Sequence, residues 1–147
     1  MRTNLTNTNK TSILYPQLSY KLQGLFFKIA NQYGLGLKEK LYHETLKDYL
    51  NELQVAYEHE KQIPIFSWRD GRKISVYIPD FIIADKIILE IKSEPFLTRI
   101  FYNQIYSYLR VTKYELSYIV NFGEEKINTR RLIFTNDRKP HLNFKPK

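Results

Sequence analysis

The chain has 147 residues, of which 43% are hydrophobic and 26% charged, the ordinary composition of a globular protein with its own core. The 23 lysines and arginines exceed the 15 acidic residues and give a net charge of +8, which favours a polyanionic partner such as nucleic acid. The lack of cysteine excludes disulfides, thiolate metal sites and a cysteine nucleophile, and the lack of a signal-peptide core or a membrane-length apolar run predicts a cytoplasmic protein without membrane association.

Two amphipathic helices are predicted in the first third of the chain. From about Gln17 to Gln32, leucine, phenylalanine and isoleucine recur at helical spacing, and Gly34 and Gly36 suit the end of that helix. A second helix is predicted from about Leu37 to Leu53, with Glu39 in its first turn. A carboxylate there is favoured by the helix dipole alone, or it is directed into a site; the sequence leaves both readings open.

Three strands are predicted next. The first covers Val55 to Phe66 and is followed by a turn at Trp68–Gly71. The other two are isoleucine-rich runs, Phe81–Ala84 and Ile87–Ile91, separated by the polar pair Asp85-Lys86. A break of about two residues between apolar runs is typical of a tight β-hairpin.

Charged residues meet on this hairpin. If its first strand extends back to Ile78, then Asp80 and Ile82 share one face with that residue, while Glu90 and Lys92 share one face of the neighbouring strand. Unpaired charge in so apolar a setting costs several kcal/mol, and a divalent metal ion with a polarised water would compensate for it. The alternative is an exposed ion pair, which contributes about 0–1 kcal/mol and no chemistry.

A third helix is predicted from about Phe96 to Thr112, with Pro95 at an early helical position. Gln104 falls within its apolar stripe, where a glutamine must find hydrogen-bond partners. It is therefore either a satisfied core residue, a residue at the edge of the stripe, or part of a site.

Strands at Tyr114–Phe122 and Arg130–Thr135 complete the series. The order helix, helix, three strands, helix, two strands predicts a mixed α/β fold in which a central sheet is flanked by helices. No repeat or linker divides the chain, so one domain is expected over residues 1–147, with residues 1–15 and 136–147 peripheral or flexible.

Five short motifs follow one another in the predicted elements. They are Gly36-Leu37-Lys38-Glu39-Lys40-Leu41-Tyr42, Pro79-Asp80, Glu90-Ile91-Lys92, Gln104 to Arg110, and Val120-Asn121-Phe122-Gly123. The second and third resemble the PD and ExK elements of the PD-(D/E)xK nuclease superfamily, whose restriction-endonuclease-like core is described as αβββαβ. The first has the form GxxExxY, which names a prokaryotic branch of that superfamily, and the last two are similar to later features of the same branch. The resemblance covers about Gln17 to Thr135.

This resemblance implies a metal-dependent nuclease that hydrolyses phosphodiester bonds, with DNA favoured over RNA. Asp80 and Glu90 would be catalytic ligands of Mg²⁺ or Mn²⁺, and Glu39 would add an outer carboxylate, to the metal directly or through water. Lys92 would orient and polarise the attacking water or stabilise the charge on the phosphate. Gln104 would hold Lys92 or the scissile phosphate in place.

Tyr42 and Tyr108 would support the ligands or contact nucleic acid, with core packing as the alternative.

Two other interpretations of the whole protein stay open. The same fold without turnover would be a binding module for nucleic acid or a partner, and the third interpretation is an unrelated α/β domain whose hairpin charges are structural. The oligomeric state is open, a homodimer included.

Overall fold

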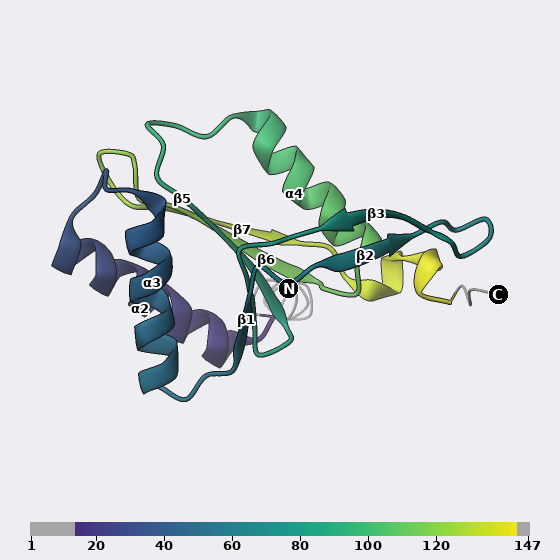
Figure 1. Ribbon diagram of the computed structural model, residues 1–147, viewed down its shortest axis with the longest axis horizontal. Coiled ribbons are helices and arrows are strands. Elements are labelled where there is room, and N and C mark those ends of the chain that lie inside the picture. Colours follow the sequence, from purple (N-terminus) through teal and green to yellow (C-terminus); the bar gives the residue numbers. More distant parts are fainter. Residues whose placement is uncertain (1–13, 144–147) are drawn as a thin grey trace, which may run out of the picture.

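The computed structural model describes residues 14–143 (Figure 1); residues 1–13 and 144–147, which fall within the segments expected to be flexible, lie outside the described residues. The helices are α2 (Pro16–Tyr33), α3 (Glu39–Glu52) and α4 (Arg99–Val111). The strands are β1 (Tyr57–His59), β2 (Ile63–Phe66), β3 (Lys73–Tyr77), β4 (Phe81–Ile83), β5 (Ile87–Lys92), β6 (Leu116–Asn121) and β7 (Asn128–Ile133). No helix within the described part of the chain is long and apolar enough to cross a membrane.

Five strands form one mixed sheet in the order β1-β4-β5-β6-β7. β5 and β6 are parallel and are joined through α4, whereas the other neighbouring pairs are antiparallel. The hairpin of β4 and β5 pairs Phe81 with Leu89 and Ile83 with Ile87, as the two isoleucine-rich runs predict. The predicted fold class, a mixed sheet flanked by helices, is confirmed, and α3, β1, β4, β5, α4 and β6 follow the order αβββαβ.

Different helices cover the two faces of this sheet (Figure 1). On one face α2 and α3 bury side chains such as Phe26 and Leu46 against β4, β5 and β6. On the other face Leu109 of α4 packs in one cluster with Ile82 and Ile88. Because β4 and β5 are buried on both faces, they appear in the sequence as continuous apolar runs without polar alternation.

The single strand predicted from Val55 to Phe66 is wrong. The segment forms two strands in different sheets, because the chain turns at Glu60, whose φ is 55°. β2 pairs with β3 in a separate hairpin that projects away from the main sheet (Figure 1). The strand predicted to run through Asp80 is also interrupted: β3 ends at Tyr77 and β4 begins at Phe81. Asp80 therefore lies immediately before its strand.

The third helix begins at Arg99 rather than Phe96. Thr98 is its N-cap, and the threonine hydroxyl accepts a backbone N–H from the first turn at 3.1 Å. Pro95 consequently lies in the preceding loop and not at an early helical position. Ile100, an apolar residue in the first turn of this helix, is 80% exposed.

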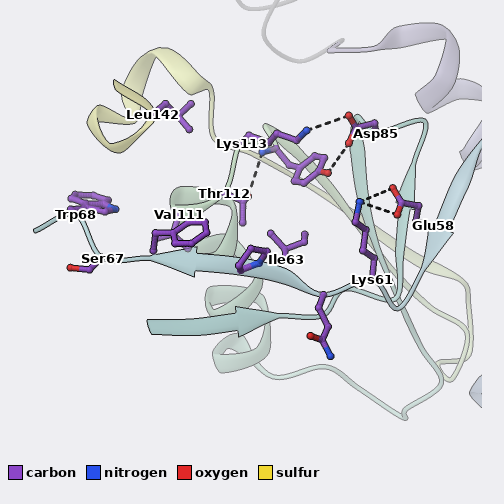
Figure 2. A pocket seen from close by; sticks show the side chains of 14 residues that line it. Glu58, Lys61, Ile63, Ser67, Trp68, Asp85, Val111, Thr112, Lys113 and Leu142 are labelled. Atoms are coloured by element: carbon purple, nitrogen blue, oxygen red, sulfur yellow. Dashed lines mark hydrogen bonds and ion pairs between the residues drawn. The ribbon is translucent and has the colours of Figure 1, made fainter. Parts of the chain in front are cut away.

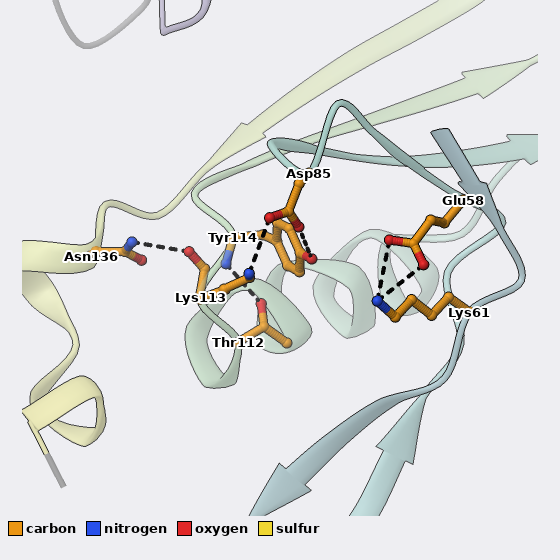
Figure 3. Close-up of polar contacts among 7 residues, drawn as sticks. All are labelled: Glu58, Lys61, Asp85, Thr112, Lys113, Tyr114 and Asn136. Carbon is orange, nitrogen blue, oxygen red and sulfur yellow. Dashed lines mark hydrogen bonds and ion pairs between the residues drawn. The ribbon is translucent and has the colours of Figure 1, made fainter. Parts of the chain in front are cut away.

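The segment from residue 136 was expected to be loosely held, but its described part is attached to the fold. Residues 136–143 form two short 3₁₀ helices, and the buried Lys139 donates from Nζ to the carbonyl oxygens of Thr112 at 3.0 Å and Tyr114 at 2.7 Å. Burial lowers the pKa of Lys139 to about 8. The Tyr114 hydroxyl in turn donates to Asp85 in the β4–β5 turn at 2.7 Å (Figure 3), so the start of β6 is tied to both segments.

Candidate active site

Asp80 and Glu90 lie next to each other across the β4–β5 hairpin, because Phe81 is paired with Leu89. The backbone N–H of Ile91 donates to Asp80 Oδ2 at 2.7 Å. The backbone N–H of Asp80 points to Glu90 Oε1 at 3.4 Å. The two carboxyl groups that the sequence places in one site therefore do meet, held by backbone groups of both strands.

Both carboxyl groups are largely removed from water. Glu90 is 7% exposed and the side chain of Asp80 is 23% exposed. Burial raises the pKa of each carboxyl, and the neighbouring charge of Asp80 raises that of Glu90 further. The charge of Lys92 opposes this rise, but no ion pair joins it to either carboxylate within residues 14–143. Within residues 14–143 the one ion-pair partner near these carboxyls is His43, whose Nε2 lies 3.6 Å from Asp80 Oδ2, and Glu90 has no such partner.

This donor set fits a hard divalent cation. Mg²⁺ prefers oxygen ligands, needs only one or two carboxylates from a protein and keeps several waters. No group of three or more histidine, aspartate or glutamate side chains arranged to hold a metal is found within residues 14–143. A cation at Asp80 and Glu90 would therefore take its remaining ligands from water and substrate.

Tyr77, which the sequence did not single out, supports Glu90 directly. Its hydroxyl donates to Glu90 Oε2, and burial together with the charge of Glu90 strongly raises the pKa of Tyr77. The hydroxyl therefore keeps its proton and remains a donor. The Tyr77 ring stacks on Tyr108 of α4, with centroids 3.9 Å apart and an interplanar angle of 6°. Tyr108 thus lies behind the residue that holds a predicted ligand.

Two histidines extend the site on the other side, and they too were missed. His43 Nε2 lies 3.6 Å from Asp80 Oδ2, and His43 Nδ1 is hydrogen-bonded to His59 Nε2 at 3.0 Å. His59 Nδ1 lies 3.6 Å from Glu60 Oε1, and burial lowers the pKa of His59. His43 follows Glu39 by four residues, so a shared helical face was visible in the sequence. No sequence pattern indicated the contact between His43 and His59 of β1.

Glu39 is the first residue of α3 and is partly buried. No hydrogen bond or ion pair joins it to another residue of the described chain. It lines a hollow of about 360 Å³ together with Lys40, His43, Glu44, His59 and Glu60. The structure therefore places Glu39 on the side of Asp80 that His43 contacts, and shows no direct contact with the carboxyl pair.

The side chain of Lys92, the last residue of β5, reaches α4, the helix that carries Gln104. The Lys92 ammonium is 5.1 Å from the centre of the Phe101 ring. Gln104 comes one turn after Phe101 and one turn before Tyr108, and its side chain is exposed, which excludes the buried alternative. Residues three and four apart share a helix face. Gln104 therefore lies on α4 between Phe101, which Lys92 contacts, and Tyr108, which stacks on Tyr77.

The GxxExxY segment has a packing role. Tyr42 is completely buried, and its ring stacks on Phe122 with centroids 4.1 Å apart. Its hydroxyl donates to one backbone carbonyl at 2.8 Å and accepts one N–H at 3.2 Å. Gly36, whose φ of 85° favours glycine, donates its N–H to the Phe122 carbonyl at 2.7 Å. These contacts position the start of α3, where Glu39 lies, and leave Tyr42 no surface for nucleic acid.

The Asn121-Phe122-Gly123 end of β6 holds the chain that follows Lys92. Buried Asn121 accepts the N–H of Glu94 at 3.0 Å and donates to its carbonyl at 2.9 Å. The Phe122 N–H donates to the Lys92 carbonyl at 2.7 Å. A side chain at Gly123 would overlap the backbone of Glu94. This motif therefore fixes the backbone at the end of β5.

A larger hollow of about 670 Å³ lies elsewhere, beside β2 and the end of α4 (Figure 2). It has apolar walls, and its charged residues are paired, Glu58 with Lys61 and Asp85 with Lys113 (Figures 2 and 3). None of the predicted site residues lines it. The chemistry of the carboxyl pair, rather than the size of this hollow, identifies the candidate site.

Replacing Glu90 by glutamine is expected to stabilise the metal-free protein by about 1–2 kcal/mol. Glutamine removes a buried charge and its repulsion from Asp80, while its carbonyl oxygen still accepts a hydrogen bond. Because the pKa of Glu90 is raised in the fold, the wild type loses stability as pH rises from the ordinary carboxyl range through that raised pKa. The advantage of Glu90→Gln should therefore grow with pH, as measured by urea unfolding with chelator present.

The matched control is Glu125→Gln, at an exposed position in the turn before β7. It should stay within about 0.5 kcal/mol of wild type at every pH. A Glu90→Gln protein less stable than wild type at pH 8 would contradict the charge argument.

A family model described as the PD-(D/E)XK nuclease superfamily matches residues 16–132 of the chain. This segment contains α2 to β6, most of β7 and every candidate site residue discussed above. No curated protein and no solved structure matches.

Proposed function

Because the chain belongs to the PD-(D/E)XK nuclease superfamily, we propose that it is a metal-dependent nuclease that hydrolyses phosphodiester bonds, in DNA rather than RNA. The observation that carries this proposal is the pair of Glu90, which is buried, and Asp80, which is partly buried; the two are adjacent and held by backbone N–H groups. Lys92 at the end of the same strand supports it, because its charge acts on both carboxyls.

Asp80 and Glu90 would hold Mg²⁺ or Mn²⁺, which when bound supplies Lewis acidity and a polarised water. Glu39 would contribute an outer carboxylate, to the metal directly or through water. Lys92 would orient the attacking water or stabilise the developing charge on the phosphate. Gln104, exposed on α4, would hold Lys92 or the scissile phosphate.

We further propose that the chain belongs to the GxxExxY branch of the superfamily. The contacts of Gly36 and Tyr42 with Phe122 support this, because they give the motif a reason to occur together with the Asn-Phe-Gly end of β6. The net charge of +8 supports nucleic acid as the partner, and the preference for DNA rests on the resemblance. A cytoplasmic location belongs to the same proposal.

Nuclease activity is tested on linear and circular DNA, single- and double-stranded, and on RNA. Each substrate is incubated with Mg²⁺, with Mn²⁺ and with chelator. The expected result is cutting that requires the metal and prefers DNA, and circular substrates separate internal from terminal cutting. Metal-dependent binding without cutting of any substrate would instead identify a binding module on the same fold.

Metal binding should also raise the free energy of unfolding of the protein. A ligand that binds only the folded state at 100 times its Kd raises the free energy of unfolding by about 2.7 kcal/mol. Mn²⁺ is expected to raise the Tm of the wild type and to leave that of Asp80→Ala unchanged, in thermal unfolding followed by circular dichroism. Equal responses of the two proteins would show that Asp80 is not a ligand.

A further inference from the structure

Each carboxyl group of the site has one oxygen engaged by a strong donor of the protein. Asp80 Oδ2 accepts the N–H of Ile91 at 2.7 Å. Glu90 Oε2 accepts a hydrogen bond from the hydroxyl of Tyr77. Among the described residues, Glu90 Oε1 accepts only the N–H of Asp80, at the long distance of 3.4 Å. The arrangement leaves one oxygen of each carboxylate for a cation.

Tyr77 cannot easily withdraw from Glu90. The residue is 4% exposed, and its ring packs among Ile65, Ile82 and Ile88. Tyr108 covers one face of the ring, stacked at 3.9 Å. The β2–β3 hairpin and α4, which come from separate parts of the chain, therefore fix the hydroxyl against Oε2.

The number of free oxygens matters for the choice of metal. Ca²⁺ takes six to eight oxygen ligands and commonly binds carboxylates through both oxygens. Mg²⁺ requires near-ideal octahedral geometry and binds one or two carboxylates with several waters. Two carboxylates that each offer a single oxygen therefore favour the small octahedral cation over Ca²⁺.

We propose that Tyr77 is a positioning residue that restricts Glu90 to one metal-facing oxygen, and that it thereby selects Mg²⁺ and Mn²⁺ over Ca²⁺. The inference rests on the proposed metal site at Asp80 and Glu90. It goes beyond that proposal, because it assigns metal selection to a residue outside the ligand set.

The test measures the Kd of Mn²⁺ and of Ca²⁺ by calorimetry on the full chain without substrate. Tyr77→Phe removes only the hydroxyl, and loss of a partner that orients a metal ligand typically weakens metal affinity by about 10- to 100-fold. In Tyr77→Phe the affinity for Mn²⁺ is expected to fall by this factor, while the affinity for Ca²⁺ falls less or rises. The ratio of the Ca²⁺ Kd to the Mn²⁺ Kd, which measures the preference for Mn²⁺, should therefore decrease. A purely structural role would weaken both ions by the same factor.

Tyr114→Phe is the matched control. It removes the same atom from another buried tyrosine that donates to a carboxylate, Asp85 at 2.7 Å, away from the site (Figure 3). Its affinities for both ions should equal those of the wild type. If Tyr77→Phe does not fold, Tyr108→Leu is the second variant. It removes the ring that stacks on Tyr77 and should likewise reduce the preference for Mn²⁺ over Ca²⁺.

The outcomes separate the two proposals. Wild-type binding of Mn²⁺ with unchanged or equally weakened affinities in Tyr77→Phe overturns the role of Tyr77 and leaves the metal site standing. A wild type that binds neither ion overturns the metal site and this inference together. A narrowed preference in Tyr77→Phe but not in Tyr114→Phe supports the inference.

Discussion

Lys92→Ala is expected to reduce phosphodiester hydrolysis by more than about 100-fold, the loss typical when one preorganised group that stabilises transition-state charge is removed. Lys92 ends β5 two residues after Glu90, and its charge acts on both carboxyls of the site. No ion pair of Lys92 is found within residues 14–143. Its removal should therefore change the chemistry far more than the stability.

Initial rates with Mg²⁺ on the best DNA substrate provide the measurement, with unfolding curves recorded on the same samples. Lys126→Ala is the control, because it removes an equal charge from an exposed position in the turn before β7. It should keep wild-type rates. Undiminished cutting by Lys92→Ala would place the reaction at another site.

The sequence could predict the meeting of Asp80 and Glu90 because their positions depend on local pairing. Two apolar runs with a short polar break form a hairpin, and the register follows from the break. The same argument could not find Tyr77 or His43. Tyr77 reaches Glu90 because the chain leaves the strand between Tyr77 and Phe81, and no local pattern announces that interruption.

The α4 region shows a similar division. Its existence followed from apolar periodicity, but its start did not, because the helix begins after its N-cap Thr98, and Pro95, predicted at an early helical position, lies in the preceding loop. Ile100 is apolar and stands in the first turn of the helix, and yet it is exposed. Periodicity predicts which residues share a face; the partner of that face is decided by the whole fold.

The motifs that resemble a family acquire physical meaning only in three dimensions. Gly36 and Tyr42 both contact Phe122, which lies far along the chain, and Phe122 also hydrogen-bonds to Lys92. These contacts connect the start of α3 to the ends of β5 and β6. The segments that carry the carboxyl pair are thus held by a frame, by which we mean the contacts of Gly36 and Tyr42 with Phe122 and those of Asn121 and Gly123 with Glu94. None of these residues is Asp80 or Glu90. Damage to this frame should reduce both stability and activity.

Gly123→Ala is the sharpest test of that frame and is expected to destabilise the protein by about 3 kcal/mol, the upper end for overpacking a tight contact. The added Cβ would overlap the backbone nitrogen and oxygen of Glu94 and lie 2.5 Å from the carbonyl carbon of Ser93. That backbone cannot simply move aside, because Asn121 holds both its N–H and its carbonyl. Activity should fall as well, since the displaced segment follows Lys92.

Gly24→Ala is the matched control, because Gly24 lies within α2 and a Cβ there would meet no atom within 4 Å. Alanine is the better helix former, so this change should stabilise the protein by about 0.5–1 kcal/mol. Urea unfolding followed by circular dichroism compares the two variants. If Gly123→Ala lowers the free energy of unfolding and Gly24→Ala raises it, the close contact of Gly123 with Glu94 stabilises the fold. If Gly123→Ala is as stable as the wild type, the segment after Lys92 can move without loss of stability, and the contacts around Phe122 and Asn121 do not fix it.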